Sequence, residues 1–295
     1  MTPYFRIIGL GEVLWDLFPD GDHFGGAPAN IACTAAGLLG PSGSVKLVSA
    51  LGDDQRGRDA INFLKQRHVN VSELQISDAP TGTVTVQLDD LDQPLFNISS
   101  NSAWDNIVWS KRWYHLAAKV DAICFGSLAQ RGTTSRKTIQ EFIGATSANA
   151  LKVFDMNLRE PFYEPDTLIQ SLKLANILKL NEEELCVIAK IISISGDSID
   201  VLKRLQDDYQ LSCIALTQGA AGAVLINHSE TINAPSLPTT VVDTVGAGDA
   251  FTAALIIGLL RNQSLTEIAN FATKVASFVC SQRGATPKLP DWIGG

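Results

Sequence analysis

The amino-acid sequence predicts an α/β fold with a mostly parallel central sheet, helices on both faces, and a small antiparallel β-sheet beside it. Two observations lead to this fold class. From residue 122 onward, short apolar segments alternate with longer amphipathic ones, as in parallel strands joined by helices. Earlier, residues 81–88 alternate polar and apolar side chains, the period of a strand with one wet face. Neither repeats nor low-complexity linkers interrupt the 295 residues, so we expect a single domain over 1–295.

The central sheet is expected to begin at the apolar residues 5–10 and to continue at 46–51, with an amphipathic helix over 55–67. Later strands are predicted at 122–125, 152–155, 177–180, 213–217 and 222–227, and helices at 133–146, 167–174, 182–192, 198–209, 243–260 and 265–282. Ligands of such sheets bind beyond the carboxyl ends of the strands, so the site is expected in the loops that follow strands.

The small sheet is expected from two segments, near 13–25 and 81–110, which would stand away from the main body. The strand at 81–88 has its hairpin partner at 95–98, across a turn at 89–94. Residues 13–18 form a further strand, and 19–22 are predicted to be a turn. Three tryptophans that follow the hairpin, Trp104, Trp109 and Trp113, are expected to pack in the interior.

The composition excludes several classes of function. A net charge of −8 and a pI of about 5.0 argue against nucleic acid or an anionic membrane as the partner. The five cysteines are widely spaced and odd in number, which is typical of free thiols in a reducing compartment. Glu12 and Asp16 interrupt the first apolar stretch, so it does not resemble a signal peptide. We therefore expect a cytoplasmic protein with a small-molecule substrate.

The most informative stretch is Asp243-Thr244-Val245-Gly246-Ala247-Gly248-Asp249, which leads directly into the apolar segment 253–260. Two glycines allow a tight turn, and backbone N–H groups at the start of a helix bind anions. A carboxylate at the mouth of such a turn repels a phosphate, but it can accept a proton from a hydroxyl that attacks a bound phosphoryl group. The same turn is also typical of an ordinary helix capped by Asp.

Other segments add polar groups at suitable places. Gly25-Gly26-Ala27-Pro28-Ala29-Asn30 places small residues and an amide at a helix start, which suits either ligand approach or tight helix packing. Asp16 lies in apolar surroundings, either as a strand-edge residue facing water or as an acceptor for substrate hydroxyls. Polar loops directly follow three predicted strands, at 155–159, 181–184 and 217–219. Together these loops favour a phosphate- or metal-binding site over a purely structural role.

Two of these motifs, 25–30 and 243–249, resemble the signatures of the ribokinase/fructokinase family of carbohydrate kinases, also called the phosphofructokinase-B family. Gly11-Glu12, Asp16 and Asn181-x-x-Glu184 match the family pattern at the expected distances, and the resemblance covers nearly the whole chain. The opening Gly-Glu and Pro28 resemble the fructokinase branch most. The resemblance implies a ribokinase-like fold and an ATP-dependent sugar kinase. In this family the lid closes over the sugar and often builds a homodimer.

The resemblance also implies roles for particular residues. Asp249 matches the catalytic base, and the N–H groups of Gly246, Ala247 and Gly248 match the anion hole. Sugar contacts are implied for Asp16, Gly26, Asn30 and Arg159. Nucleotide contacts are implied for Thr217, Gly219, Gly246 and Gly248, Mg²⁺ held through water for Asn181 and Glu184, and a K⁺ ligand for Asp243.

The sequence departs from the family in the lid. Many fructokinases carry an aromatic-Arg pair in the lid strand, where this chain has Phe96-Asn97-Ile98. Fructose is the first expectation for the substrate, and 2-keto-3-deoxygluconate, ribose or a nucleoside are alternatives, since a fold does not fix a substrate. A catalytically silent sugar- or nucleotide-binding regulator is the alternative outside enzymes, although the intact Asp249 argues against it.

Overall fold

The computed structural model describes residues 3–19, 21–88, 94–290 and 292–293, so most of the turn predicted at 89–94 lies outside the described residues. Its larger sheet is nine-stranded. Across the sheet the order is β13 (Thr231–Ala234), β12 (Ala223–Asn227), β11 (Cys213–Thr217), β10 (Ile177–Asn181), β9 (Leu151–Asp155), β8 (Ala122–Phe125), β1 (Phe5–Leu10), β4 (Gly43–Gly52) and β5 (Leu74–Ser77).

The predicted parallel sheet is confirmed from β11 to β5, where every neighbouring pair is parallel. Only β12 and β13 are added in antiparallel fashion, through a pair of hairpins. The sequence did not predict β5 or β13. Both are four-residue strands at the sheet edges with mostly half-buried or exposed side chains, so neither shows a continuous apolar segment.

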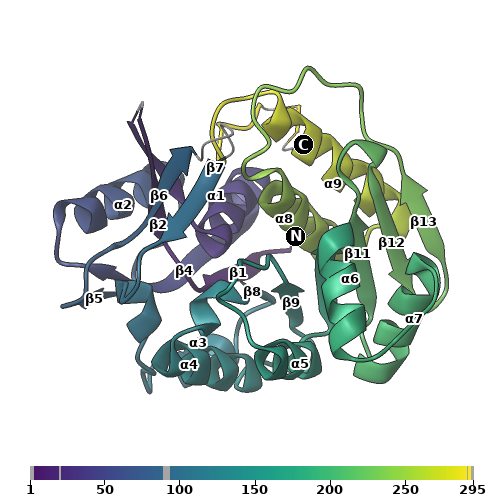
Figure 1. Ribbon diagram of the computed structural model, residues 1–295, viewed down its shortest axis with the longest axis horizontal. Coiled ribbons are helices and arrows are strands. Elements are labelled where there is room, and N and C mark those ends of the chain that lie inside the picture. Colours follow the sequence, from purple (N-terminus) through teal and green to yellow (C-terminus); the bar gives the residue numbers. More distant parts are fainter. Residues whose placement is uncertain (1–2, 20, 89–93, 291, 294–295) are drawn as a thin grey trace.

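Helices cover both faces of this sheet, as predicted (Figure 1). One layer consists of α1 (Ala27–Leu39), α2 (Gln55–Gln66), α8 (Ala247–Leu260) and α9 (Leu265–Cys280), and the other of α3 (Trp113–Ala117), α4 (Thr133–Gly144), α5 (Pro165–Leu174), α6 (Glu182–Ile191) and α7 (Ser198–Tyr209). Successive strand residues enter opposite cores: Ile7 packs in the first layer and Ile8 in the second.

The central helix α8 is buried on nearly all sides, because Ala253 to Ile257 are each fully inaccessible to solvent. Such a uniformly apolar helix belongs inside a protein. The sequence predicted a helix from residue 243, but α8 begins at Ala247. Its N-cap Gly246 takes up the left-handed region, with φ 78°, so residues 243–246 form a turn rather than a helical segment.

The smaller sheet lies beside α1 and α2 (Figure 1). Its strand order is β3 (Gly21–Gly25), β2 (Leu14–Phe18), β6 (Gly82–Leu88) and β7 (Pro94–Ile98). The hairpin of β6 and β7 is antiparallel, as predicted, and β2 and β3 form a second antiparallel pair, while β2 and β6 pair in parallel at the centre. The prediction of a turn over 19–22 was wrong at its end, because Gly21 and Asp22 already pair with β2. The exposed polar side chains of Asp22 and His23 hid this strand from sequence reasoning.

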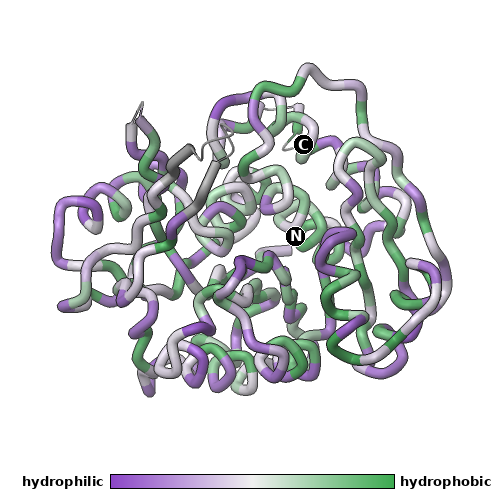
Figure 2. The backbone as a smooth tube through the Cα atoms, in the orientation of Figure 1, coloured by the Kyte–Doolittle hydropathy of each residue, from purple (hydrophilic) through white to green (hydrophobic). Residues whose placement is uncertain are grey.

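The tryptophans that follow the hairpin contribute to packing, as expected from the sequence. Trp104 and Trp113 are fully buried, and Trp109 packs edge-on against Trp113. In Figure 2 hydrophilic and hydrophobic residues alternate along the outer helices at the lower edge, as expected of helices with one polar and one apolar face. None of the helices in the described part of the chain combines the length and the hydropathy that crossing a bilayer requires.

Candidate active site

Three loops and the α8 turn meet at the carboxyl edge of the parallel strands. The loop after β9 reaches the start of α6, since the Leu158 N–H donates to Glu184 Oε1 at 2.9 Å. Neighbouring strand ends lie in register, with Asn181 of β10 paired to Thr217 of β11. The polar loops chosen from the sequence therefore lie at one edge, where parallel sheets bind ligands.

Asp249 is the central side chain of this edge. It lies in the first turn of α8, and its Oδ2 accepts a hydrogen bond from Asn30 Nδ2 at 2.8 Å. This bond joins the two glycine-rich motifs, which are 219 residues apart in the sequence. Burial raises the pKa of Asp249 to about 6, and the nearby Asp155 carboxylate adds to the effect. A carboxylate with such a pKa is a better proton acceptor near neutral pH than an ordinary aspartate.

Two further acids lie near the start of α1: Glu12, which is buried, and Asp16, which is half-buried. Asp16 is on β2, an interior strand of the smaller sheet, so it is not a strand-edge residue. Burial raises its pKa to about 6, although the positive charge of Arg159 opposes this. Glu12 is 2% exposed, and burial raises its pKa to about 7. One Glu12 oxygen accepts the Ala27 N–H at 3.2 Å.

Two buried oxygens in this region have no hydrogen-bond partner among the described residues: Glu12 Oε2 and Asn30 Oδ1. Buried polar atoms are usually paired, so unpaired ones indicate a ligand or a functional role. Gly26, the N-cap of α1, has φ 106°, and a Cβ there would lie 2.6 Å from the Glu12 carbonyl oxygen. Only glycine allows this approach of the two segments. This region is the polar half of the site.

Asn181 and Glu184 form a capping box at the start of α6. Asn181 Oδ1 accepts the Glu184 N–H, and Glu184 Oε2 accepts the Asn181 N–H, both at 2.8 Å. Each Glu184 oxygen therefore already accepts one backbone N–H, and burial raises the pKa of this carboxyl. These bonds fix both side chains. Asn181 lines the pocket described next, and Glu184 is buried and does not line it.

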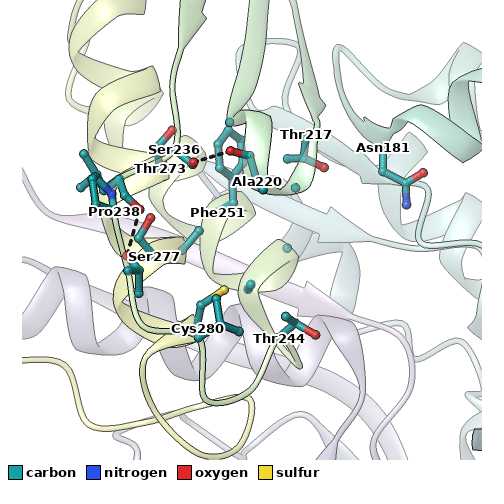
Figure 3. A pocket seen from close by; sticks show the side chains of 18 residues that line it. Asn181, Thr217, Ala220, Ser236, Pro238, Thr244, Phe251, Thr273, Ser277 and Cys280 are labelled. Atoms are coloured by element: carbon teal, nitrogen blue, oxygen red, sulfur yellow. Dashed lines mark hydrogen bonds between the residues drawn. The ribbon is translucent and has the colours of Figure 1, made fainter.

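A pocket of about 600 Å³ opens beside the α8 turn (Figure 3). Asn181 and Thr217 lie at one side of it, and Pro238 and Ser277 lie at the other. Its lining includes the predicted residues Thr217, Gly219, Ala247 and Gly248, together with Leu237, Val241, Phe251 and Thr273. The volume is in the range of cofactor sites, and a largely apolar wall with an anion-binding turn suits a nucleotide.

Asp243 supports the turn from its other side. Its two oxygens accept the N–H groups of Val245 and Gly284, each at 3.0 Å. Gly246 packs directly against Ala285, because a Cβ on Gly246 would lie 2.5 Å from the Ala285 Cα. The Ala247 N–H donates to the Thr244 carbonyl at 3.3 Å. Within the described chain, no group of three or more His, Cys, Asp or Glu side chains is arranged to hold a metal ion.

Sequence reasoning missed a buried ion pair next to the turn. Lys179 on β10 is 3.0 Å from Asp155 on β9, and both side chains are almost fully buried. Thr252 of α8 donates to the same carboxylate at 2.7 Å. A lysine inside an otherwise apolar strand was the available signal, because a buried charge requires a partner.

Comparisons with known proteins agree with this architecture. The model of the pfkB family of carbohydrate kinases matches residues 21–292. A fructokinase from Klebsiella pneumoniae is 31% identical, over 97% of this chain and 96% of the relative.

Solved structures give the same result. The crystal structure of a Xylella fastidiosa fructokinase with bound ATP superimposes with a TM-score of 0.85 at 22% identity, covering 97% of this chain and 95% of that one. A sugar kinase from Pyrococcus horikoshii, in complex with ATP, is 29% identical with a TM-score of 0.80, over 95% and 94%. The predicted ribokinase-like fold is confirmed, and the chain belongs to the pfkB family of carbohydrate kinases, phosphotransferases that act on a sugar.

Proposed function

We propose that this carbohydrate kinase transfers the γ-phosphoryl group of ATP to a hydroxyl of a small sugar, with fructose as the first candidate and Asp249 as general base. The observation that carries the proposal is the 2.8 Å hydrogen bond between Asn30 and Asp249. This bond links a half-buried carboxylate in the first turn of α8 to the polar half of the site. A proton acceptor at that position lies where a sugar hydroxyl would meet a phosphoryl group.

The reaction follows from this placement. The sugar is held by Asn30 Oδ1, Asp16, Gly26 and Arg159. One of its hydroxyl groups donates its proton to Asp249. Its oxygen forms a bond to the γ-phosphorus, and the bond from that phosphorus to the bridging oxygen of ADP breaks. The N–H groups of Gly246, Ala247 and Gly248 stabilise the charge on the transferring group. Positioning and charge stabilisation supply most of the rate in such transfers.

ATP is proposed to lie in the 600 Å³ pocket, with its phosphates toward Gly248 and its base toward the apolar side. Thr217 and Gly219 would contact the nucleotide at the end of β11. Mg²⁺ would neutralise phosphate charge when bound. Because Glu184 already accepts two backbone N–H groups, the Asn181–Glu184 pair suits a metal held through water better than a directly coordinated one.

Three further properties are proposed from the family resemblance. Asp243 would be a K⁺ ligand, although both its oxygens already accept backbone N–H groups that support the α8 turn. The smaller sheet would act as a lid over the sugar and as the contact of a homodimer. Turnover with and without K⁺ tests the role of Asp243, and molar mass by light scattering tests the homodimer.

The identity of the sugar depends on the smaller sheet. Asn97 of β7 is exposed, and this strand has no arginine. Asp16 and Arg159 together offer one acceptor and one cation, which suit a neutral sugar with several hydroxyl groups. The cation would also suit the carboxylate of 2-keto-3-deoxygluconate, so the choice between these substrates is left to experiment.

The decisive test is ATP consumption, with Mg²⁺ and K⁺, against fructose, other hexoses, ribose, 2-keto-3-deoxygluconate and adenosine. One clear winner, with fructose expected, establishes the substrate. A preference for 2-keto-3-deoxygluconate or adenosine would replace fructose and keep the kinase. ATP binding without turnover on any sugar would favour the silent regulator.

A further inference from the structure

A buried lysine lies directly behind the anion-binding turn. Lys179 is on β10, with its side chain 8% exposed. A Cβ built on Gly248 would lie 3.1 Å from Lys179 Nζ, and no other heavy atom outside the neighbouring backbone comes as close to that position. The ammonium group therefore faces the first turn of α8 from the sheet side. Glycine at 248 leaves room for the two groups to approach.

The same lysine belongs to a chain of hydrogen bonds that ties α8 to the sheet. Lys179 Nζ donates to Asp155 Oδ1 at 3.0 Å, and Thr252 Oγ1 donates to Asp155 Oδ2 at 2.7 Å. Thr252 lies one turn after Gly248, whose carbonyl oxygen is 3.0 Å from the same hydroxyl. The chain thus runs from two neighbouring strands to the backbone of the turn.

The charges around this chain are mostly negative, with one lysine among three carboxylates. Asp155, Glu184 and Asp249 surround Lys179, and although burial lowers its pKa, these carboxylates together raise it above the ordinary value. The 3.0 Å ion pair with Asp155 favours the charged form of Lys179. Even a hydrogen-bonded buried ion pair is often no more stabilising than apolar residues of the same volume, so stability alone is a weak reason for it. A site that must hold a phosphoryl group gives the buried cation a use.

We propose that Lys179, Asp155 and Thr252 are positioning residues of the phosphoryl transfer. They fix the first turn of α8 on the sheet and place one positive charge behind Gly248. This inference rests on the proposed function, because it takes the α8 turn as the anion hole.

The physical reason is the low polarity of the surroundings. A charge that is fixed in a buried site stabilises developing negative charge more strongly than a solvated one. The lysine does not enter the nucleotide pocket, so it should affect the transferring group more than ground-state binding of ATP. Loss of the chain should therefore lower kcat more than it raises either KM.

The test uses Thr252→Val, Thr252→Ser and Lys179→Met in the full chain. Valine keeps the shape of threonine without the hydroxyl, whereas serine keeps the hydroxyl. We expect Thr252→Val to lower kcat about tenfold, and Thr252→Ser to stay near the parent. We expect Lys179→Met to lower kcat by about 10- to 100-fold. Both KM values should change less than about threefold, as for interactions made in the transition state.

Lys46→Met is the matched control. Lys46 also extends from a sheet strand and pairs with a carboxylate, Glu73, at 3.1 Å, but on β4 away from the α8 turn. Its turnover should equal that of the parent. Circular dichroism and thermal melting show whether each variant is folded. If Lys179→Met does not fold, the Thr252 pair decides, because a serine that rescues the valine defect requires the hydroxyl.

A second measurement is independent of the sugar and of Asp249. Calorimetry gives the ratio of ADP to ATP dissociation constants, which reports the contribution of the γ-phosphate. Lys179→Met should reduce this ratio by no more than about threefold, in step with the small expected change in the KM for ATP, while Asp249→Asn leaves it unchanged or increases it. Folded Lys179 and Thr252 variants with parental kcat and parental ADP/ATP ratio would overturn the inference, as would a defect confined to KM. Failure of the proposed base would instead appear as an active Asp249→Asn.

Discussion

The two halves of the site are built from different materials. The proposed nucleotide half is a pocket of backbone turns and apolar side chains, lined by Gly219 and Gly248, with Gly246 at the N-cap of α8 beside it. The proposed sugar half is made of polar side chains, and it contains the unpaired buried oxygens of Glu12 and Asn30. The backbone-built half depends on conformation, and the side-chain half depends on charge and hydrogen bonding. Substitutions should therefore fail in different ways in the two halves.

The largest effect is expected at Asp249, where the halves meet. Asp249→Asn keeps the size of the side chain and an acceptor for Asn30 but removes the base, so kcat should fall about 10³-fold or more. ATP affinity, measured by calorimetry, should remain within about threefold because the anion-binding turn is intact. Turnover near the parental value would mean that the proton is accepted elsewhere.

The next effect concerns the backbone-built half. Gly246→Ala places a Cβ 2.5 Å from the Ala285 Cα in a backbone with φ 78°, so the turn must shift. We expect kcat to fall about 10²-fold, as when an anion-hole donor is lost.

Gly40→Ala is the control for backbone strain alone. Gly40 also has positive φ, 50°, but a Cβ there meets nothing within 4 Å. Both variants should lose at least about 1–2 kcal/mol of stability from the positive φ, and the Gly246 variant should lose more because its Cβ also meets Ala285. Only the Gly246 variant should lose activity. Equal activity in the two would show that the turn does not need its present shape.

A smaller effect is expected in the side-chain half. Asn30→Ala should raise the sugar KM about tenfold, the size of one hydrogen bond in a buried site, with little change in the ATP KM. The opposite pattern would mean that the two sites are exchanged.

The same variant should change the pH dependence. Asp249 must be ionised to act as base, so parental kcat should decline as the pH falls through about 6. The Asn30 hydrogen bond lowers the pKa of Asp249, so its loss should move the decline to higher pH. A pH–rate profile of both proteins checks the direction of the shift. An unchanged profile would mean that the Asn30 hydrogen bond does not affect the pKa of the base.

The comparison of the two halves also explains how much the sequence could predict. The turn at 243–249 was found because its glycines are required by backbone geometry, which a linear sequence displays directly. Asn181 and Glu184 were found because they follow a predicted strand and match the family motif, and in the structure the same spacing forms a capping box. Most strands of the larger sheet were also predicted, because their buried residues form continuous apolar segments.

The missed features depend on distant segments. Lys179 pairs with Asp155 only after β9 and β10 lie side by side, and nothing in the local sequence indicates this partner. The strand β3 has exposed polar residues, and only its pairing with β2 defines it. Glu12 was noted as part of a motif, but its burial depends on the packing of α1 against the loop after β1.

Glu12 provides the smallest expected effect on turnover and the clearest effect on stability. Its pKa is raised by burial from 4.5 to about 7 in the folded protein. The folded state thus binds a proton more tightly than the unfolded state. The stability linked to Glu12 is complete below about pH 4.5 and is lost as the pH rises through about 7.

Glu12→Gln should remove this loss. Gln keeps an acceptor for the Ala27 N–H, so the variant should be more stable than the parent at pH 8, by an amount of order 2–3 kcal/mol at most. Thermal melting at pH 6 and pH 8 measures the difference. Glu73→Gln is the opposite control, because hydrogen bonds from Trp113, Lys46 and Ser72 outweigh burial and lower the pKa of Glu73. That variant should be less stable at pH 8, so an equal response of both variants would mean that Glu12 is ionised in the folded protein at no cost.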